Sequence, residues 1–172
     1  GGSGNYVAVT KSTTGTSNVG KIVTGVSSST NTFYTSFLLN VGTVGTGYFA
    51  ALTTAINSGT YNGRIFMQSA SGGYNLGIAK SSGTATYGST ILTTGTTYLI
   101  VVKYVYSTGT TTDDQVYLWV NPTISSEPLT SSAEVSDLTT IDASAMSNSS
   151  FGFTLRNPTT SPNYSIDGIK VA

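Results

Sequence analysis

The sequence predicts an all-β protein, an antiparallel two-sheet β-sandwich that forms one domain over residues 1–172. Three observations support this fold class. β-branched and aromatic residues gather in short runs, and Gly, Ser, Thr and Asn separate these runs about every 8–12 residues. Apolar residues at helical spacing are hard to find. The charged share is only 8% and the apolar residues are spread along the chain, so disorder is not expected.

The runs place the strands in order along the chain. They are expected at residues 5–10, 20–26, 32–42, 47–54, 63–69, 74–80, 84–92, 97–106, 115–121, 150–156 and 164–171. Turn residues lie between them, as at Asn62-Gly63 and Ser82-Gly83. Residues 122–149 lack clean alternation and are expected to form a long loop across one end of the sandwich, with room for a short strand. Residues 1–4 are a possible linker, engineered or natural.

Side-chain alternation assigns the faces of several strands. The predicted core side chains of two strands are Phe33, Phe37, Leu39 and Val41, and Phe151, Phe153 and Leu155. In the strand at 97–106, Lys103 shares parity with Leu99 and Val101. A lysine is rarely buried without a partner, so this face is expected to be the wetter one. The tyrosines of the same strand are then placed in the core or at its rim.

Composition excludes several classes of function. Seven basic and seven acidic residues give a formal net charge of zero, so no basic field attracts a nucleic acid. The chain has no cysteine and no histidine. Disulfides, thiolate metal sites and His-dependent catalytic arrangements are therefore excluded. No apolar run approaches the ~20 residues of a membrane-spanning helix, so membrane insertion is not expected.

Several stretches resemble a known group of domains. FYTSFLLNVG, YNLGIAKSSG, YLIVVKYVYSTGTTTDDQVYLWVNP and the closing SIDGIKVA are similar to laminin G-like, concanavalin A-like jelly rolls of large secreted and surface bacterial proteins. The most specific pieces are Asp113–Pro122 and Ile166–Val171. The resemblance implies a concanavalin A-like jelly roll at an extracellular or cell-surface location, beside other domains of the same polypeptide. It also implies roles in glycan binding, adhesion or spacing, often with structural calcium.

Catalysis is not expected. A glycosidase on this fold needs two carboxylates about 5–10 Å apart, commonly from one strand. The acids of this chain are Asp113, Asp114, Glu127, Glu134, Asp137, Asp142 and Asp167. None of the expected strands carries two alternating acids, and Glu127 and Glu134 both fall in the long loop.

Asp167 and the Asp113-Asp114 pair are the candidate metal ligands, with calcium as the expected ion. Asp167 shares parity with Ile169 and Val171 and is expected to point inward, where a carboxylate needs a partner. That partner is either calcium, a turn N–H or a lysine. Adjacent carboxylates at 113 and 114 repel each other, which favours a cation, but aspartates also stabilise ordinary turns.

Lys103 has three interpretations. It is a lysine on the outer face of a sheet with its ammonium in water, or a ligand contact, or one side of an intramolecular isopeptide bond to an Asn or Asp on a neighbouring strand. The third interpretation needs a buried acid nearby, and Asp167 is the candidate for it.

The candidate ligand-binding residues combine aromatic rings with hydrogen-bond donors, the pairing that sugar recognition uses. Trp119, the sole tryptophan, is either a binding platform or a core residue. Further platform candidates are Tyr48, Tyr61, Tyr74 and Tyr87. Donors in the outward sets of several strands predict one mildly basic sheet face suited to a hydroxyl-rich or acidic glycan. They are Tyr34, Asn40, Arg64, Gln68, Lys103 and Arg156. The alternative is that these polar residues are scattered over the surface.

The sequence thus favours a non-catalytic extracellular module that binds carbohydrate or mediates adhesion, with a polysaccharide or cell-surface glycan as partner. The alternative is a structural spacer or assembly module of a large bacterial surface protein, with no small ligand.

Overall fold

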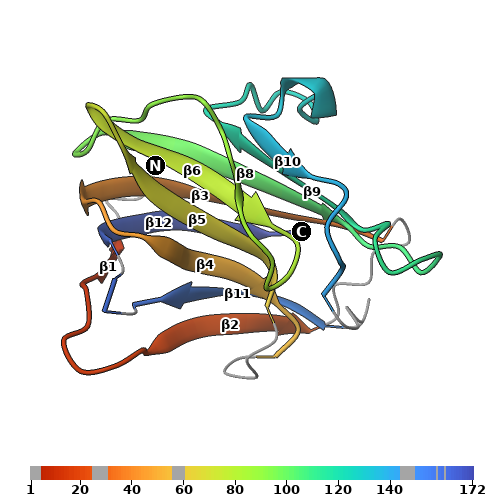
Figure 1. The fold of residues 1–172 in the computed structure, drawn as a ribbon, viewed down its shortest axis with the longest axis horizontal. Coiled ribbons are helices and arrows are strands. Elements are labelled where there is room, and N and C mark those ends of the chain that lie inside the picture. Colours follow the sequence, from red (N-terminus) through yellow and green to blue (C-terminus); the bar gives the residue numbers. More distant parts are fainter. Residues whose placement is uncertain (1–4, 25–30, 56–60, 144–149, 158, 161) are drawn as a thin grey trace.

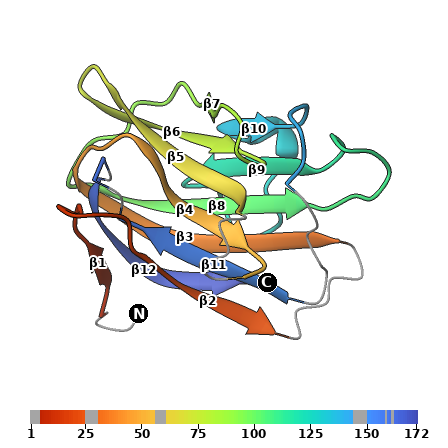
Figure 2. The same cartoon turned by 60° about the horizontal axis from the view of Figure 1, so that its bottom comes forward.

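Two antiparallel sheets of six strands pack against each other (Figure 1, Figure 2). The computed structural model describes residues 5–24, 31–55, 61–143, 150–157, 159–160 and 162–172. The predicted all-β sandwich is confirmed, and most expected strands lie within a few residues of their predicted positions. Among the described residues, no helix has the length and apolarity that a membrane crossing would need.

Each sheet is built from strands far apart in the sequence. Sheet A has the order β1 (Val7–Val9), β12 (Asn163–Val171), β3 (Thr32–Thr43), β8 (Thr97–Val105), β9 (Gln115–Val120) and β10 (Val135–Asp137). Sheet B has the order β2 (Asn18–Thr24), β11 (Ser150–Arg156), β4 (Gly47–Thr53), β5 (Asn62–Ala70), β6 (Gly73–Ala79) and β7 (Thr86–Tyr87). A short 3₁₀ helix, Thr130–Ser132, lies in the loop before β10.

The core lies between the inner faces of the two sheets, as alternation predicts. The side chains predicted to face inward on β3 and β11 are all buried there. Phe33 of β3 stacks on Phe151 of β11 with ring centroids 4.4 Å apart. Tyr104 of β8 is fully buried, while Tyr98 of β8 and Tyr106, which directly follows it, pack at the rim of the core. The prediction for the β8 tyrosines is therefore confirmed.

A second, smaller apolar cluster lies on the outer face of sheet A. It contains Val101, Tyr117 and Trp119, with Tyr34, Leu99 and Ala133 packed at its border. The long loop after β9 covers it, and the Trp119 indole Nε1–H donates to the carbonyl of Leu129 at 3.1 Å. The described part of the loop predicted at 122–149, residues 122–143, therefore covers this cluster near Leu129 and contributes the edge strand β10.

Two expectations about strands were wrong in detail. The strand expected at 84–92 is reduced to Thr86–Tyr87 and an isolated bridge from Leu92 to Tyr74. On β12, the register with β3 shifts after Asp167, where Gly168 adopts φ +62°. Ile166 faces the core and Ile169 is 41% exposed, so Asp167 lies half-buried on the outer side. Its predicted inward direction fails because parity does not continue through a bulge.

Candidate functional site

The outer face of sheet B brings aromatic, cationic and amide side chains together. Tyr48 comes from β4, Arg64, Phe66 and Gln68 come from β5, and Arg156 comes from β11. Strand alternation causes this arrangement, because the β5 residues between them fill the core. All five are half-buried, so each keeps some surface open to solvent. We call this set of residues the arginine–tyrosine face.

Tyr48 is the centre of this face. The guanidinium Cζ of Arg156 lies 4.2 Å from the centroid of its ring, and that of Arg64 lies 4.8 Å from it. The rings of Phe66 and Tyr61 lie 5.7 Å and 5.9 Å away. Stacking uses the flat face of a guanidinium and leaves its in-plane N–H groups able to donate. Both cations therefore lie next to the same aromatic ring.

A glycine in β6 lets another ring lie on the same face. Gly77 is directly opposite Phe66, and a Cβ atom at Gly77 would come within 2.6 Å of the Tyr87 ring. Only glycine lets the ring approach this close to the backbone. Tyr48 and Tyr87 thus belong to strands of this sheet, and Tyr61, which directly precedes β5, is only 5% exposed. Tyr74, the fourth candidate, is fully buried.

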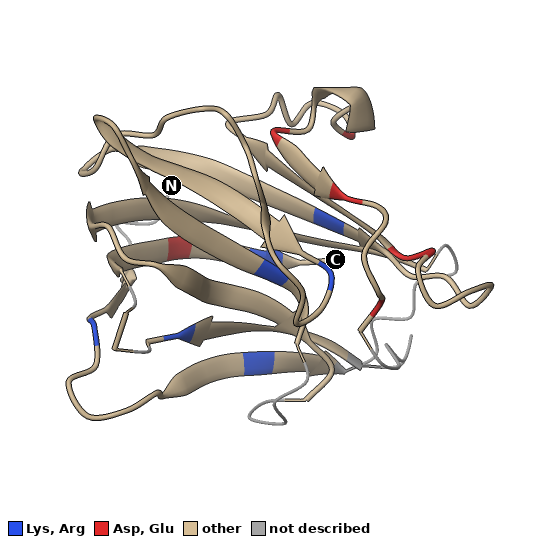
Figure 3. Cartoon of the chain, in the orientation of Figure 1, with Lys and Arg blue, Asp and Glu red and all other residues tan. Residues whose placement is uncertain are grey.

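All charged residues in the strands of sheet B are basic. Its six strands contain Lys21, Arg64 and Arg156 and no acidic residue. Figure 3 shows these cations spread across the sheet, whereas most acids lie near β9, β10 and their loops. The Nε of Arg64 is buried and has no hydrogen-bond partner among the described residues. Lys21 is paired with Phe153, whose side chain lies in the core, so Lys21 points away from the outer face. The outer face thus carries two cations, Arg64 and Arg156, in a chain of zero net charge.

A cleft of about 610 Å³ adjoins the arginine–tyrosine face. Tyr61 and Arg64 line one side of it, and the loop residues Thr140 and Asp142 contribute to the other. The cleft therefore offers a cation, hydroxyl groups and a carboxylate within one polar space. Such a lining suits a hydroxylated ligand with a negative group turned toward Arg64.

The structure divides the predicted donor set between two faces. Arg64, Gln68 and Arg156 lie on the outer face of sheet B, whereas Tyr34, Asn40 and Lys103 belong to β3 and β8 of sheet A. The prediction of one shared face is wrong for the second group. Strand parity cannot tell which of two sheets a strand belongs to.

Each sheet A donor has a partner inside the protein. The Lys103 ammonium and the Tyr34 hydroxyl both donate to Oε1 of Glu127, each at 2.5 Å. The Lys103 hydrogen bond comes first among the causes that hold the pKa of Glu127 below its ordinary value. Asn40 donates its side-chain amide to the carbonyl of Gly95 at 2.9 Å. These contacts fasten loops onto sheet A.

The structure does not support Trp119 as a binding platform or Lys103 as one side of an isopeptide bond. Trp119 is 2% exposed under the covering loop, so its ring is not an exposed platform. The residues directly opposite Lys103 are Tyr34 and Tyr117, which offer no amide or carboxyl group for an isopeptide bond. Lys103 is therefore a half-buried sheet-face lysine that is ion-paired with Glu127.

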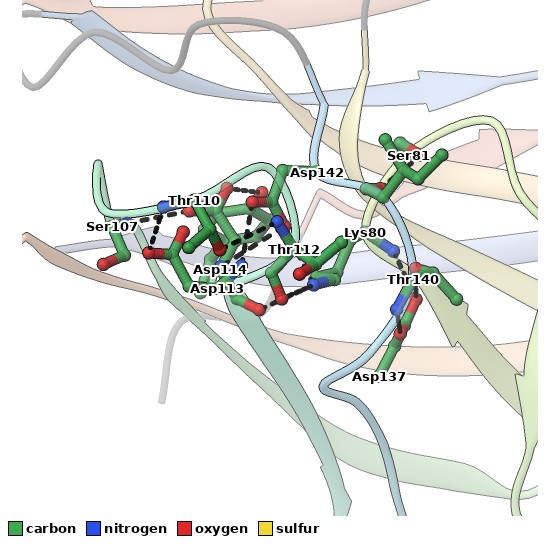
Figure 4. A network of polar contacts seen from close by, with 12 residues as sticks. Lys80, Ser81, Ser107, Thr110, Thr112, Asp113, Asp114, Asp137, Thr140 and Asp142 are labelled. Carbon is green, nitrogen blue, oxygen red and sulfur yellow. Dashed lines mark hydrogen bonds and ion pairs between the residues drawn. The ribbon is translucent and has the colours of Figure 1, made fainter.

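The candidate metal ligands do not all meet. Asp113 and Asp114 lie with Asp142, with one carboxylate oxygen of each within 4.8 Å of the others. Asp167 is not in this group, and its Oδ1 accepts the N–H of Gly168 at 2.7 Å. Figure 4 shows Lys80 reaching into the cluster. Neither Lys80 nor Asp142 was singled out from the sequence, because no local pattern marks the burial of a lysine beside a remote loop.

Asp114 is the buried member of this cluster. It accepts hydrogen bonds from the Tyr104 hydroxyl at 2.5 Å and from the N–H of Ser107 at 2.7 Å. Burial nevertheless raises the pKa of its carboxyl, because the charged form loses hydration. The contacts of this carboxylate tie the hairpin loop between β8 and β9 to the core.

No protein-family model matches the chain, and no curated protein matches its sequence. Solved structures share its fold. The SAP-like pentraxin from Limulus polyphemus aligns with a TM-score of 0.57 and 12% identity, over 95% of this chain and 73% of the pentraxin. The alginate lyase Aly36B, in complex with alginate tetrasaccharide, aligns with a TM-score of 0.54 and 14% identity, over 96% and 79% of the two chains.

The galectin LEC-6 from Caenorhabditis elegans aligns with a TM-score of 0.51 and 11% identity, over 98% of this chain and 96% of the galectin. These structures are concanavalin A-like jelly rolls, and the likeness shows that this chain has the same fold. At such low identity it shows the fold alone.

Proposed function

We propose that the protein is a non-catalytic extracellular module that binds an acidic polysaccharide through the arginine–tyrosine face. The observation that carries this proposal is the stacking of Arg64 and Arg156 on Tyr48, on a sheet whose strands contain no acidic residue. Guanidinium groups donate bidentate hydrogen bonds to carboxylates and sulfates. Aromatic rings offer the flat apolar surface that sugar CH groups pack against.

The fold neighbours support the ligand class without establishing it. One of them is a galectin, and another is a lyase bound to an alginate tetrasaccharide, which is an acidic glycan. The strands of sheet B contain no acidic residue, so the arginine–tyrosine face itself lacks the carboxylate pair that glycosidases use.

The test is a binding measurement on immobilised polysaccharides. The probes are alginate and polygalacturonate as acidic chains, with a neutral β-glucan for comparison, each in calcium and again in chelator. We expect retention on the acidic chains only. Arg64→Ala and Arg156→Ala should each weaken binding by about tenfold or more, since each removes charge-assisted hydrogen bonds.

The control is Lys103→Ala, which removes a cation from the other sheet. It should bind as the unchanged protein does, because Lys103 faces away from sheet B and pairs with Glu127. Equal losses in all three variants would point to non-specific charge attraction. Undiminished binding by both arginine variants would refute the assigned face.

A second candidate function, an assembly module within a larger surface protein, has its own observation. Where β1 and β12 face β2 and β11, the sheet edges leave an apolar groove of about 430 Å³. Val19 and Val7 are 59% and 43% exposed there. A neighbouring domain of the same polypeptide would cover this surface. If the protein bound none of the glycans and Val19→Ser lost the interdomain contact, these results would favour the assembly function.

A further inference from the structure

Lys80 is the only lysine with a fully buried side chain among the described residues. It follows β6 directly, and its backbone joins two neighbouring segments. Its N–H donates to Oδ2 of Asp137 at 3.0 Å, and its carbonyl accepts the N–H of Gly63 at 3.0 Å. The backbone therefore fixes where the side chain starts. From there it extends toward the hairpin loop between β8 and β9 (Figure 4).

The ammonium of Lys80 ends inside a cage of oxygen atoms. Nζ donates to the carbonyl oxygens of Thr112 and Asp114 at 3.0 Å and 2.8 Å, and to Oδ1 of Asp142 at 2.8 Å. An ammonium has three hydrogens, and each has an acceptor here. Two carbonyls and a carboxylate are also the kind of ligand that calcium takes.

The other carboxylate oxygens of this cluster accept protein donors as well. Both oxygens of Asp142 accept backbone N–H groups, those of Asp113 and Asp114, at 3.0 Å and 3.2 Å. Asp113 Oδ2 accepts the N–H of Thr110 at 2.7 Å. Of the six carboxylate oxygens, only Asp113 Oδ1 has no partner among the described residues. Calcium needs about six to eight oxygen ligands, so this donor set does not fit it while Lys80 is in place.

We propose that the Lys80 ammonium is the resident cation of the Asp113–Asp114–Asp142 cluster and occupies the position that structural calcium would otherwise take. This disagrees with the calcium implied by the resemblance to laminin G-like domains. The lysine links the end of β6 to the β8–β9 loop and to the segment around Asp142, three parts that are remote in sequence. It therefore gives the protein a stability that does not depend on calcium.

The test measures the melting temperature in millimolar calcium and in chelator. The unchanged protein should melt at the same temperature in both, and equilibrium dialysis should find no bound calcium. Lys80→Met keeps the apolar stem but removes the ammonium. It should lower the melting temperature by roughly 10 °C, because it leaves carboxylates and carbonyls buried without their cation.

Lys103→Met is the matched control. Its ion pair with Glu127 is partly exposed, so the melting temperature should change by no more than about 3 °C. Bound calcium that is lost in Asp142→Asn, or a melting temperature of the unchanged protein that rises in calcium, would overturn the proposal. A Lys80→Met variant as stable as the unchanged protein would do so too. If that variant does not fold, the calcium measurements on the unchanged protein decide alone.

The proposal is independent of the glycan. A protein that binds no polysaccharide can still melt at one temperature with and without calcium. Conversely, acidic glycans can be retained by Arg64 and Arg156 whatever cation holds the Asp142 cluster. The melting experiment and the glycan-binding experiment can therefore each contradict its own proposal without affecting the other.

Discussion

The two ion-paired lysines, Lys80 and Lys103, show how residue chemistry depends on context. Both have a carboxylate within 2.8 Å of Nζ. Lys103 is tied to a side chain that is 56% exposed, so water and salt compete for that ion pair. Lys80 is itself fully buried and is tied to two carbonyls and to a carboxylate that is 11% exposed, so its charge would be costly without these partners. Only the second contact is expected to contribute substantially to stability.

Asp137 provides a pH prediction at this scale. Burial acts to raise the pKa of its carboxyl, but hydrogen bonds from Thr140 and from the Lys80 N–H outweigh burial and leave the pKa below its ordinary value. The unfolded chain then binds the proton more tightly than the folded one. The stabilisation is fully present above the unfolded pKa of about 3.9 and is lost as the pH falls through the lower folded value.

Asp137→Asn should therefore cost about 1–3 kcal/mol of unfolding free energy at pH 7 and much less near pH 2. Urea unfolding followed by the fluorescence of buried Trp119 measures both values. A cost that does not change with pH would mean that the charge of Asp137 plays no part.

At the scale of the element, strand β12 shows how one residue can interrupt the alternation of side chains along a strand. Gly168 adopts φ +62°, a left-handed conformation that side chains other than glycine rarely take. Before it, Ile166 faces the core, and after it the register with β3 has shifted. Asp167 precedes the shift and lies outside the core by alternation with Ile166, so the bulge changes only the direction of the residues that follow it.

Gly168→Ala should destabilise the protein by about 1–2 kcal/mol, the cost of the left-handed conformation for alanine. No atom lies within 4 Å of the added Cβ, so no clash contributes. Gly15→Ala is the control, because its Cβ also meets open space and its φ is not in the positive range. Equal effects of the two substitutions in thermal unfolding would exclude strain at the bulge.

At the scale of the whole molecule, each sheet pairs a strand near the start of the chain with a strand near its end. Val7 of β1 pairs with Ile166 of β12, and β12 lies between β1 and β3 in sheet A. Sheet B likewise pairs β2 with β11. Neither sheet is complete until the last strands are present, so the loops to be closed span nearly the whole chain.

Refolding should accordingly be slow, with a main phase of about milliseconds to seconds, as in other β-sandwiches dominated by contacts between distant residues. Stopped-flow dilution from urea with Trp119 fluorescence measures it. A complete signal within microseconds would show that local structure, rather than the pairing of β1 with β12, limits folding.

The sequence by itself determined the fold class, nearly all strand positions and the inward faces of β3, β8 and β11. These follow from alternation and turn chemistry, which act between neighbouring residues. Alternation also identified Arg64, Gln68 and Arg156 as outward-facing donors. The tertiary structure alone decided that Tyr34, Asn40 and Lys103 lie on the other sheet and that a loop buries Trp119. It also decided that Lys80 meets Asp142. Sheet membership, bulges and buried ion pairs depend on contacts between residues far apart in the chain, and no local pattern encodes them.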